Sequence, residues 1–254
     1  MFERSEADAF LDLVRAGPPE LDTRAVTFDG VAVLTRPGPD ASFWCQVVGF
    51  EEPPPADLIG AIVDHLRDRG VEQARFALPP HARTGDWAAI AAKYGLTPAG
   101  RTLKLAARPS LDVAPAPAVT LVEPSDHERW SQVMWRVFGL STPANIAISV
   151  AALKQPVFRA YARWDGDEIV ATGLVRLHPD GAHLFSGATI STHRGHGAQS
   201  AVIAARVAAA AEAGCPVLVA ETGVVPDGYN TSARNLIRAG FEPRYERETW
   251  LWTP

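Results

Sequence analysis

Apolar and polar residues follow two different periods in the second half of the chain. The segment 126–139 places its apolar residues three or four positions apart, which predicts an amphipathic helix. The runs 169–177 and 182–190 are rich in β-branched and small apolar residues, which predicts strands. The segment 198–213 is expected to be a helix that stops at Gly214. The last elements expected are a strand at 216–221 and a helix at 231–239, stopped by Gly240.

The two halves of the chain share their turn residues. The tripeptide FDG at 28–30 precedes the strand-like VAVLT, as WDG at 164–166 precedes IVATGLV. The tetrapeptides GLTP at 95–98 and GFEP at 240–243 each close a helix and open a final strand. The separation of matched positions grows from 136 to 145 residues, which is typical of a duplication with small insertions. The alternative is that unrelated α/β segments share glycine and proline at their turns.

A linker is expected between the halves. The segment 107–120, ARPSLDVAPAPAVT, is rich in proline and alanine and has no hydrophobic period. A chain of 254 residues suits one large domain or two small ones. We therefore expect a first domain at 1–108, a linker at 109–117 and a second domain at 118–254.

Composition excludes several classes of protein. The chain is 47% hydrophobic with a net charge of -5, which argues against disorder. The pI near 5.8 argues against a nucleic-acid-binding surface. The two cysteines cannot form a disulfide framework, and Arg206 interrupts the longest apolar stretch, which is too short to span a membrane. Because no secretory signal is visible, we expect a cytoplasmic protein without a membrane or nucleic-acid partner.

A glycine-containing loop carries the main chemical signal. Residues 194–197, Arg-Gly-His-Gly, follow a predicted strand and directly precede a helix. Glycines let successive N–H groups point at one spot, and a helix N-terminus adds partial positive charge, so the loop suits a pyrophosphate. Arg194 can add a charge-assisted bond. The alternative, a dinucleotide-binding loop with Glu221 at the next strand end, lacks its third glycine at Ser200 and has too little chain after it.

From Val119 to the C-terminus the chain resembles the GNAT acyltransferase superfamily. The family's Q/R-x-x-G-x-G/A loop reads THRGHG at 192–197, with Thr192 in place of Gln or Arg. Its late N-x-x-A…GF helix is similar to residues 230–241. The resemblance implies an α/β fold of two tandem GNAT-like domains. Each is expected to be a mixed, mostly antiparallel central sheet flanked by helices.

The resemblance also implies that acetyl-CoA binds the second domain. Its pyrophosphate would lie on the loop at 194–199, and its pantetheine arm would pair with the strand backbone at 188–190, beside a bulge at Gly187. Asn230, Ser232 and Asn235 would face the thiol end. The donor-binding residues implied in this way are Ala188, Thr189, Ile190, Arg194, Gly195, His196, Gly197, Ala198, Gln199, Asn230 and Asn235.

Acyl transfer to an amine needs a base, because an alkylamine of pKa about 10.4 is mostly protonated at neutral pH. Glu221 is the candidate base, and the alternative is a solvated glutamate at a strand end. A backbone N–H near Ile190 is the candidate oxyanion donor. Many members of the family have, where this chain has Ile237, a tyrosine that acts as the general acid for the leaving thiolate. Tyr229 and Ser232 are the nearest alternatives, and Ser232 is our candidate catalytic hydroxyl.

The chain offers little support for a metal or for a second donor site. Histidines at 178, 183, 193 and 196 fit no common zinc spacing, so we expect no metal. The repeat offset places Glu51, Glu52 and the prolines at 53–55 where the first half would need its loop. Proline lacks an N–H and carboxylates repel phosphate. The first half is therefore expected to be a degenerate copy without a phosphate loop.

These observations favour an N-acetyltransferase that moves an acetyl group from acetyl-CoA to a primary amine of a small molecule. One alternative is a non-catalytic acyl-CoA-binding or sensor protein, motivated by the absent tyrosine. Another is an acetyltransferase acting on a protein or peptide. Acceptor-binding loops are expected at about 138–157. We expect a monomer whose halves act as a pseudo-dimer.

Overall fold

The computed structural model describes residues 2–38, 40–83, 85–110, 118–226 and 228–254. The chain divides into two compact units. The first comprises Met1–Lys104 together with Tyr245–Pro254, and the second comprises Leu105–Arg244. The C-terminal residues therefore join the first unit, although they follow the second half of the sequence. Most of the expected linker, 111–117, lies outside the described residues.

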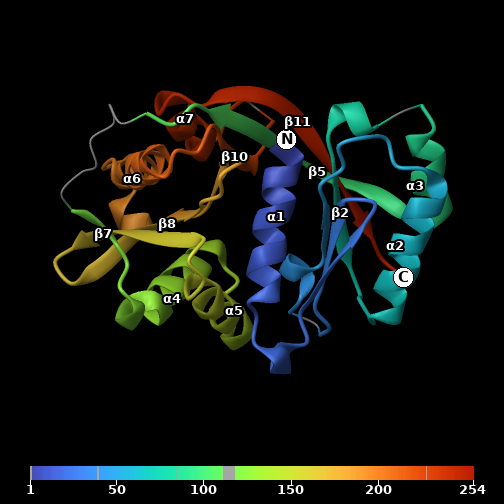
Figure 1. Cartoon of the computed structure of the whole chain (residues 1–254), viewed down its shortest axis with the longest axis horizontal. Helices are drawn as coiled ribbons and strands as arrows, with labels where there is room; N and C mark the ends of the chain where they lie inside the picture. The colour runs from blue at the N-terminus through green and yellow to red at the C-terminus, as the bar shows by residue number, and fades with distance from the viewer. Residues whose placement is uncertain (1, 39, 84, 111–117, 227) are drawn as a thin grey trace. The chain divides into compact units, whose positions relative to one another are not determined.

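The first unit is a sheet with helices on both faces. Figure 1 shows α1 on one face of its strands and α2 and α3 on the other. Its strand order includes β1-β2-β3-β4-β11, where β11 is the final strand of the chain. The elements, with the two strands that extend into the other unit, are α1 (Phe2–Arg15), β1 (Arg24–Phe28), β2 (Val31–Thr35), β3 (Gln46–Val48), α2 (Ala56–Asp68), β4 (Ala74–Leu78), α3 (Trp87–Tyr94), β5 (Leu96–Ala107) and β11 (Glu242–Trp252).

Helices on both faces explain why every residue of β2 is buried. Val31 and Val33 belong to a core with Ile59 and Ile62 of α2, while α1 covers the strand from the opposite side. A strand covered on both faces is apolar at successive positions instead of alternating. Trp252 of β11 is also fully buried in the α2 core.

The second unit has the same layered design. Its strand order is β10-β9-β8-β7-β6, and Figure 1 shows α6 on one face with α4 and α5 on the other. The elements are β6 (Val119–Leu121), α4 (His127–Phe138), α5 (Pro143–Leu153), β7 (Phe158–Asp165), β8 (Glu168–Arg176), β9 (Ala182–Thr189), α6 (Ala198–Glu212), β10 (Leu218–Gly223) and α7 (Thr231–Arg238). The helices and strands predicted for this half are confirmed to within about two residues at each end.

The segment expected as acceptor loops, 138–157, is largely helical. Helix α5 begins after Thr142, whose hydroxyl accepts a hydrogen bond from the N–H of Asn145, and Pro143 occupies its first position. A threonine N-cap followed by proline is a helix-start signal, and these two local residues account for the helix in this segment.

The order of elements and the strand pairings repeat between the units. In the first, β1, β2 and β3 pair antiparallel and β3 pairs parallel with β4. In the second, β7, β8 and β9 pair antiparallel and β9 pairs parallel with β10. In each, a helix connects the two parallel strands, and a helix and a final strand follow. The predicted fold of two tandem, mixed and mostly antiparallel sheets flanked by helices is confirmed.

Candidate functional site

The parallel strands β9 and β10 separate partway along their length. Their pairing covers three positions and ends at Leu184 opposite Ala220. Beyond these residues β9 continues to Thr189 and β10 continues to Gly223. The backbone edges of both strands are therefore not paired with each other over the last part of the sheet. Such an edge can accept an extended ligand as an added strand.

A β-bulge lies where the strands separate. On β8 and β9, Thr172 pairs with Ala188 and Leu174 pairs with Phe185, so two residues of β9 oppose the single Gly173. These two residues are Ser186 and Gly187, and Ser186 has a left-handed φ of 54°. The bulge predicted at Gly187 is confirmed. A bulge bends its strand and disrupts the local ladder, which turns β9 away from its neighbour.

The glycine loop follows the end of β9 and leads directly into α6. Gly195 and Gly197 have φ values of 81° and 76°, which favour glycine, and a Cβ on either would meet nothing within 4 Å. Gly197 is the N-cap of α6 and supplies no capping side chain. The first backbone bond at the helix start runs from the Ala201 N–H to the Gly197 carbonyl.

This geometry leaves a group of backbone donors available. Within the described chain, the N–H groups of residues 195–200 make no hydrogen bond to another backbone carbonyl. They lie at the helix end that carries partial positive charge, and residues 194–197 are exposed. Free N–H groups at an uncapped helix start suit a phosphate or diphosphate, so the loop fits the anionic part of a nucleotide-type ligand.

Three side-chain contacts hold the loop in place. His193 Nε2 lies 3.0 Å from Asp165 Oδ2, and its Nδ1 lies 3.0 Å from Thr192 Oγ1. Arg194 Nε donates to the Thr189 carbonyl at 3.2 Å. Thr192, which departs from the family pattern, therefore supports the histidine that ties the loop to the β7–β8 turn.

The amides expected at the donor thiol connect secondary-structure elements. Asn230 caps α7 by accepting from the Ala233 N–H at 2.8 Å, and its Nδ2 donates to Thr222 Oγ1 at 3.0 Å and to the Gly223 carbonyl at 2.6 Å. These bonds fasten the start of α7 to the end of β10. Asn230 thus uses both amide atoms within the protein.

A second amide contact joins α6 to α7. Asn235 Nδ2 donates to Gln199 Oε1 at 2.6 Å, and Gln199 Nε2 donates to Ser232 Oγ at 3.4 Å. The side chain of Gln199 is therefore occupied by α7, while its backbone N–H belongs to the free group at the helix start. Contact with a donor through Asn230, Asn235, Ser232 or the Gln199 side chain stays a prediction.

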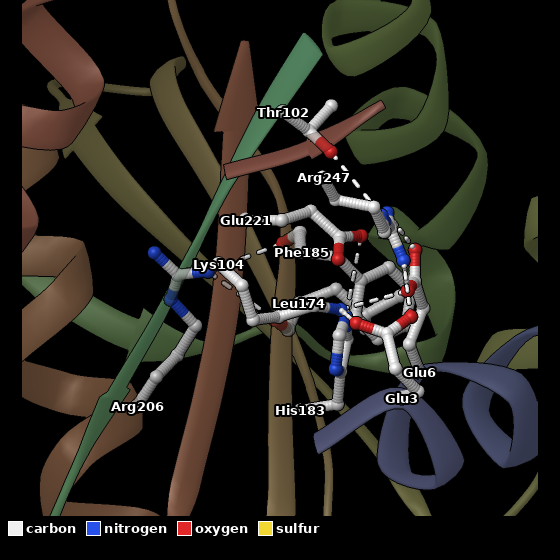
Figure 2. Close-up of polar contacts among 10 residues, drawn as sticks. All are labelled: Glu3, Glu6, Thr102, Lys104, Leu174, His183, Phe185, Arg206, Glu221 and Arg247. Carbon is white, nitrogen blue, oxygen red and sulfur yellow. Dashed lines mark hydrogen bonds and ion pairs between the residues drawn. The ribbon is translucent and has the colours of Figure 1, made fainter. Parts of the chain in front are cut away.

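Glu221 lies where β9 and β10 separate. Its Oε1 is 3.6 Å from Nε2 of His183, whose side chain is 2% exposed against 19% for Glu221 (Figure 2). Because His183 pairs with Val219, two residues before Glu221 on the parallel strand, the two side chains lie on one face of the sheet. In the sequence His183 is one of the four histidines between 178 and 196, and the strand register shows that it lies beside Glu221.

The oxyanion donor expected near Ile190 stays a prediction, but it is not the N–H of Ile190 itself. The Ile190 N–H donates to the Val170 carbonyl at 3.0 Å, so this particular group is already used in the sheet. Sheet pairing at the end of β9 could not be assigned from the sequence. For the general acid, Tyr229 is 46% exposed and Ser232 is half-buried.

Arg206 and Thr172 were not among the predicted site residues. Arg206 lies on the buried face of α6 and contacts the β9 bulge, and Thr172 contacts the same bulge from β8. The sequence feature that could have indicated a role for Arg206 is that it is a single arginine within the apolar stretch AVIAARVAAAA. Because α6 is buried at Val202, Ile203 and Val207, an arginine on that face must lie inside the protein.

Among the described residues, no group of three or more His, Cys, Asp or Glu side chains is placed to hold a metal ion. In the same residues no helix has the length and apolar character needed to cross a membrane.

Comparisons with known proteins agree with this geometry. Residues 123–241 match the model of the acetyltransferase (GNAT) family, and this range contains the bulge, the glycine loop and α7. A comparison with curated protein sequences gave no match.

Solved structures share the fold over most of the chain. A GCN5-related N-acetyltransferase from Kribbella flavida is 18% identical with a TM-score of 0.67, covering 99% of this chain and 95% of its own. A tandem GNAT protein from the clavulanic acid biosynthesis pathway is 16% identical with a TM-score of 0.59, covering 97% and 94%. A GCN5-related N-acetyltransferase from Sphaerobacter thermophilus is 13% identical with a TM-score of 0.61, covering 88% and 80%. Residues 123–241, with the bulged strand and the glycine loop, therefore form a domain of the acetyltransferase (GNAT) family, in a chain whose tandem fold is similar to that of solved GNAT proteins.

Proposed function

We propose that the protein transfers an acetyl group from acetyl-CoA to a primary amine of a small molecule, using a site in its second unit. The observation that carries the proposal is the group of free N–H donors at 195–200, placed directly beyond the strands that separate. A diphosphate with an extended arm matches both features, because the loop suits the anion and the open strand edge suits the arm.

The donor would lie along β9 and the start of α6. Its diphosphate would contact the backbone of residues 194–199, with Arg194 as a further donor. Its arm would pair with the backbone at 188–190 and run back toward Gly187. Ala188 is buried, whereas Thr189 and Ile190 are half-buried. Each strand residue spans about 3.3 Å, so the thiol end would lie near the bulge.

Glu221 is the proposed base. The amine lone pair attacks the thioester carbonyl carbon, the C–S bond breaks, and the amine proton passes to the carboxylate, directly or through a water. The coenzyme leaves as a thiolate. A thiol of pKa about 8.5 leaves near neutral pH without an acid at a cost of about 1–2 kcal/mol. Ile237, in the place of the family's tyrosine, is compatible with this chemistry.

We further propose that the first unit is a degenerate copy. Helix α2 is the counterpart of α6, and it begins directly after Pro55. The three prolines at 53–55 carry no N–H, and Glu51 and Glu52 are exposed beside them. The first unit therefore offers fewer donors and the wrong charge for a diphosphate.

A thiol-release assay with acetyl-CoA and a panel of primary amines tests the function. We expect thiol release that depends on both the amine and the enzyme. Release with peptides but with no small amine would favour the protein-directed alternative. Saturable acetyl-CoA binding without release for any acceptor would favour the sensor alternative, and no binding would overturn the proposal.

A further inference from the structure

Arg206 is a buried cation that the proposed chemistry leaves unused. The residue is 3% exposed, and no acidic side chain pairs with it in the part of the chain that the structure describes. Its Nε donates to the Val202 carbonyl at 3.1 Å. Its Nη1 donates to the Leu174 carbonyl at 3.2 Å and to the Phe185 carbonyl at 3.1 Å (Figure 2). Burial lowers the pKa of the guanidinium to about 9, so it stays protonated at neutral pH.

The guanidinium lies against the bulge. A Cβ on Gly173 would be 2.7 Å from both Cζ and Nε of Arg206, and a Cβ on Gly187 would be 3.7 Å from Nη2. The side chain therefore passes beside β8 at Gly173 and reaches β9 at Gly187. Only a residue without a Cβ leaves room for this approach at 173, which explains a glycine in the middle of a buried strand.

Arg206 and Thr172 together satisfy the carbonyls that the bulge displaces. Thr172 Oγ1 donates to the Ser186 carbonyl at 3.2 Å, and Arg206 Nη1 donates to the Phe185 carbonyl. Buried carbonyls need partners, and a bulge removes some of those that the ladder supplies. Both strands of the bulge are thus tied to α6 through one side chain, because Arg206 also holds Leu174.

The contact between Arg206 and the Phe185 carbonyl lies where the pairing of β9 with β10 ends. Phe185 is the first residue of β9 beyond Leu184, the last residue paired with β10. The Ala182 N–H donates to the Val217 carbonyl just before β10, so the alternation of the strand turns the Phe185 carbonyl toward β8. Arg206 therefore holds the bulge on the β8 side, and the bulge turns β9 away from β10. The guanidinium therefore sits at the point where the two strands separate.

We propose that Arg206 is a positioning residue that holds β9 apart from β10 and so keeps the strand edge open for the pantetheine arm of the donor. This inference rests on the proposed function for the identity of the ligand. Arg206 follows the first residue of α6 by eight positions, about 12 Å along the helix. We therefore expect it to affect binding of the arm and not of the diphosphate.

Two ligands separate these effects, namely acetyl-CoA and 3′-phospho-ADP, which carries the diphosphate without the arm. We expect Arg206→Met to weaken acetyl-CoA binding at least tenfold and to change 3′-phospho-ADP binding less than twofold, both measured by calorimetry or by displacement. Arg206→Lys should fall between, because an ammonium keeps the charge but lacks the planar fork that holds two carbonyls. Arg136→Met, at an exposed position of α4, is the matched control and should change neither.

An unchanged acetyl-CoA affinity in Arg206→Met would overturn the proposal, and so would equal loss of both ligands. Should that variant fail to fold, Thr172→Val removes the companion bond to Ser186 with little change in volume. It should weaken acetyl-CoA binding in the same direction with a smaller factor. Wild-type affinity in both Thr172→Val and Arg206→Lys would contradict a positioning role.

A measurement without ligand keeps the inference separate from the proposed function. In ligand-free protein, Arg206→Lys should accelerate amide hydrogen exchange at 185–189 several-fold. Exchange at 182–184, which is paired with β10, should stay within twofold of wild type. Equal acceleration in both segments would overturn the positioning role even if the wild type binds acetyl-CoA. The expected pattern in a protein that binds no acetyl-CoA would contradict the proposed function alone.

Discussion

His183 and Glu221 face each other across two parallel strands, with Nε2 and Oε1 3.6 Å apart at the point where the strands separate. The histidine is almost fully buried, and the glutamate is partly open to solvent. The proposed role of Glu221 as the base uses this position, because the carboxylate lies where the strands separate and is 19% exposed.

Glu221→Gln should lower the acetylation rate by about 10²–10⁴-fold while leaving acetyl-CoA affinity nearly intact, because the amide cannot accept the proton. The defect should shrink as pH rises, since more of the amine is then neutral before it binds. Steady-state rates between pH 6 and pH 10, together with calorimetric binding, check this. A variant with the wild-type rate at every pH would show that Glu221 has a structural role only.

Gly197→Val should weaken acetyl-CoA binding by more than a hundredfold, because a β-branched side chain at φ 76° strains the loop and blocks approach to its N–H groups. Gly214→Val is the matched control. Gly214 has a φ of 70° and equally open surroundings at the other end of α6. Both variants should lose similar thermal stability, but only the first should lose binding. Equal acetyl-CoA affinity in the two variants would contradict the phosphate-loop assignment.

Binding should saturate at one acetyl-CoA per chain. The second unit offers free N–H groups at 195–200, whereas α2 of the first unit begins behind three prolines. Isothermal titration of the full chain gives the stoichiometry directly. Two equivalent sites per chain would refute the degenerate-copy proposal, and Gly197→Val should then leave one of them intact.

Acid should weaken the first unit through Glu3. Burial alone would raise the pKa of Glu3, but Lys104 and Arg247 overcome this effect and hold the pKa below its ordinary value (Figure 2). A lowered folded-state pKa adds stability that is present above about pH 4.5 and is lost as pH falls through the folded value. Glu3→Gln leaves two buried cations with one carboxylate fewer, and its cost at pH 7 should be about 3–5 kcal/mol.

Denaturant unfolding at pH 7 and at pH 3.5 checks this expectation. The difference between wild type and Glu3→Gln should be smaller at the lower pH. Glu72→Gln, at an exposed position of the same unit, should stay within about 0.5 kcal/mol of wild type at both pH values. A Glu3→Gln penalty that grows toward low pH would show that Glu3 is protonated in the folded protein.

Local sequence determined most of the elements and the loop. Glycine at 195 and 197, followed by a long apolar helix, specifies left-handed turns and free N–H groups, and both are properties of neighbouring residues. The duplicated order of strands and helices was readable for the same reason, because turn residues and hydrophobic period are local. Helix α5 was missed although its Thr142 and Pro143 are local signals.

Only the tertiary structure decided how the site is held together. The pairing of His183 with Glu221 depends on strand register, and the contact of Arg206 with the bulge depends on how α6 packs across β8 and β9. Two further contacts depend on the tertiary structure. The side-chain amide of Asn230 donates to the Gly223 carbonyl of β10, and the N–H of Ile190 donates to the Val170 carbonyl. The last residues of the chain join the first unit as strand β11 beside β4, and no local pattern indicates this exchange. Pairing between distant segments depends on which surfaces and hydrogen-bonding edges remain open once the helices and strands have formed. The order of residues along one sequence does not specify this pairing directly.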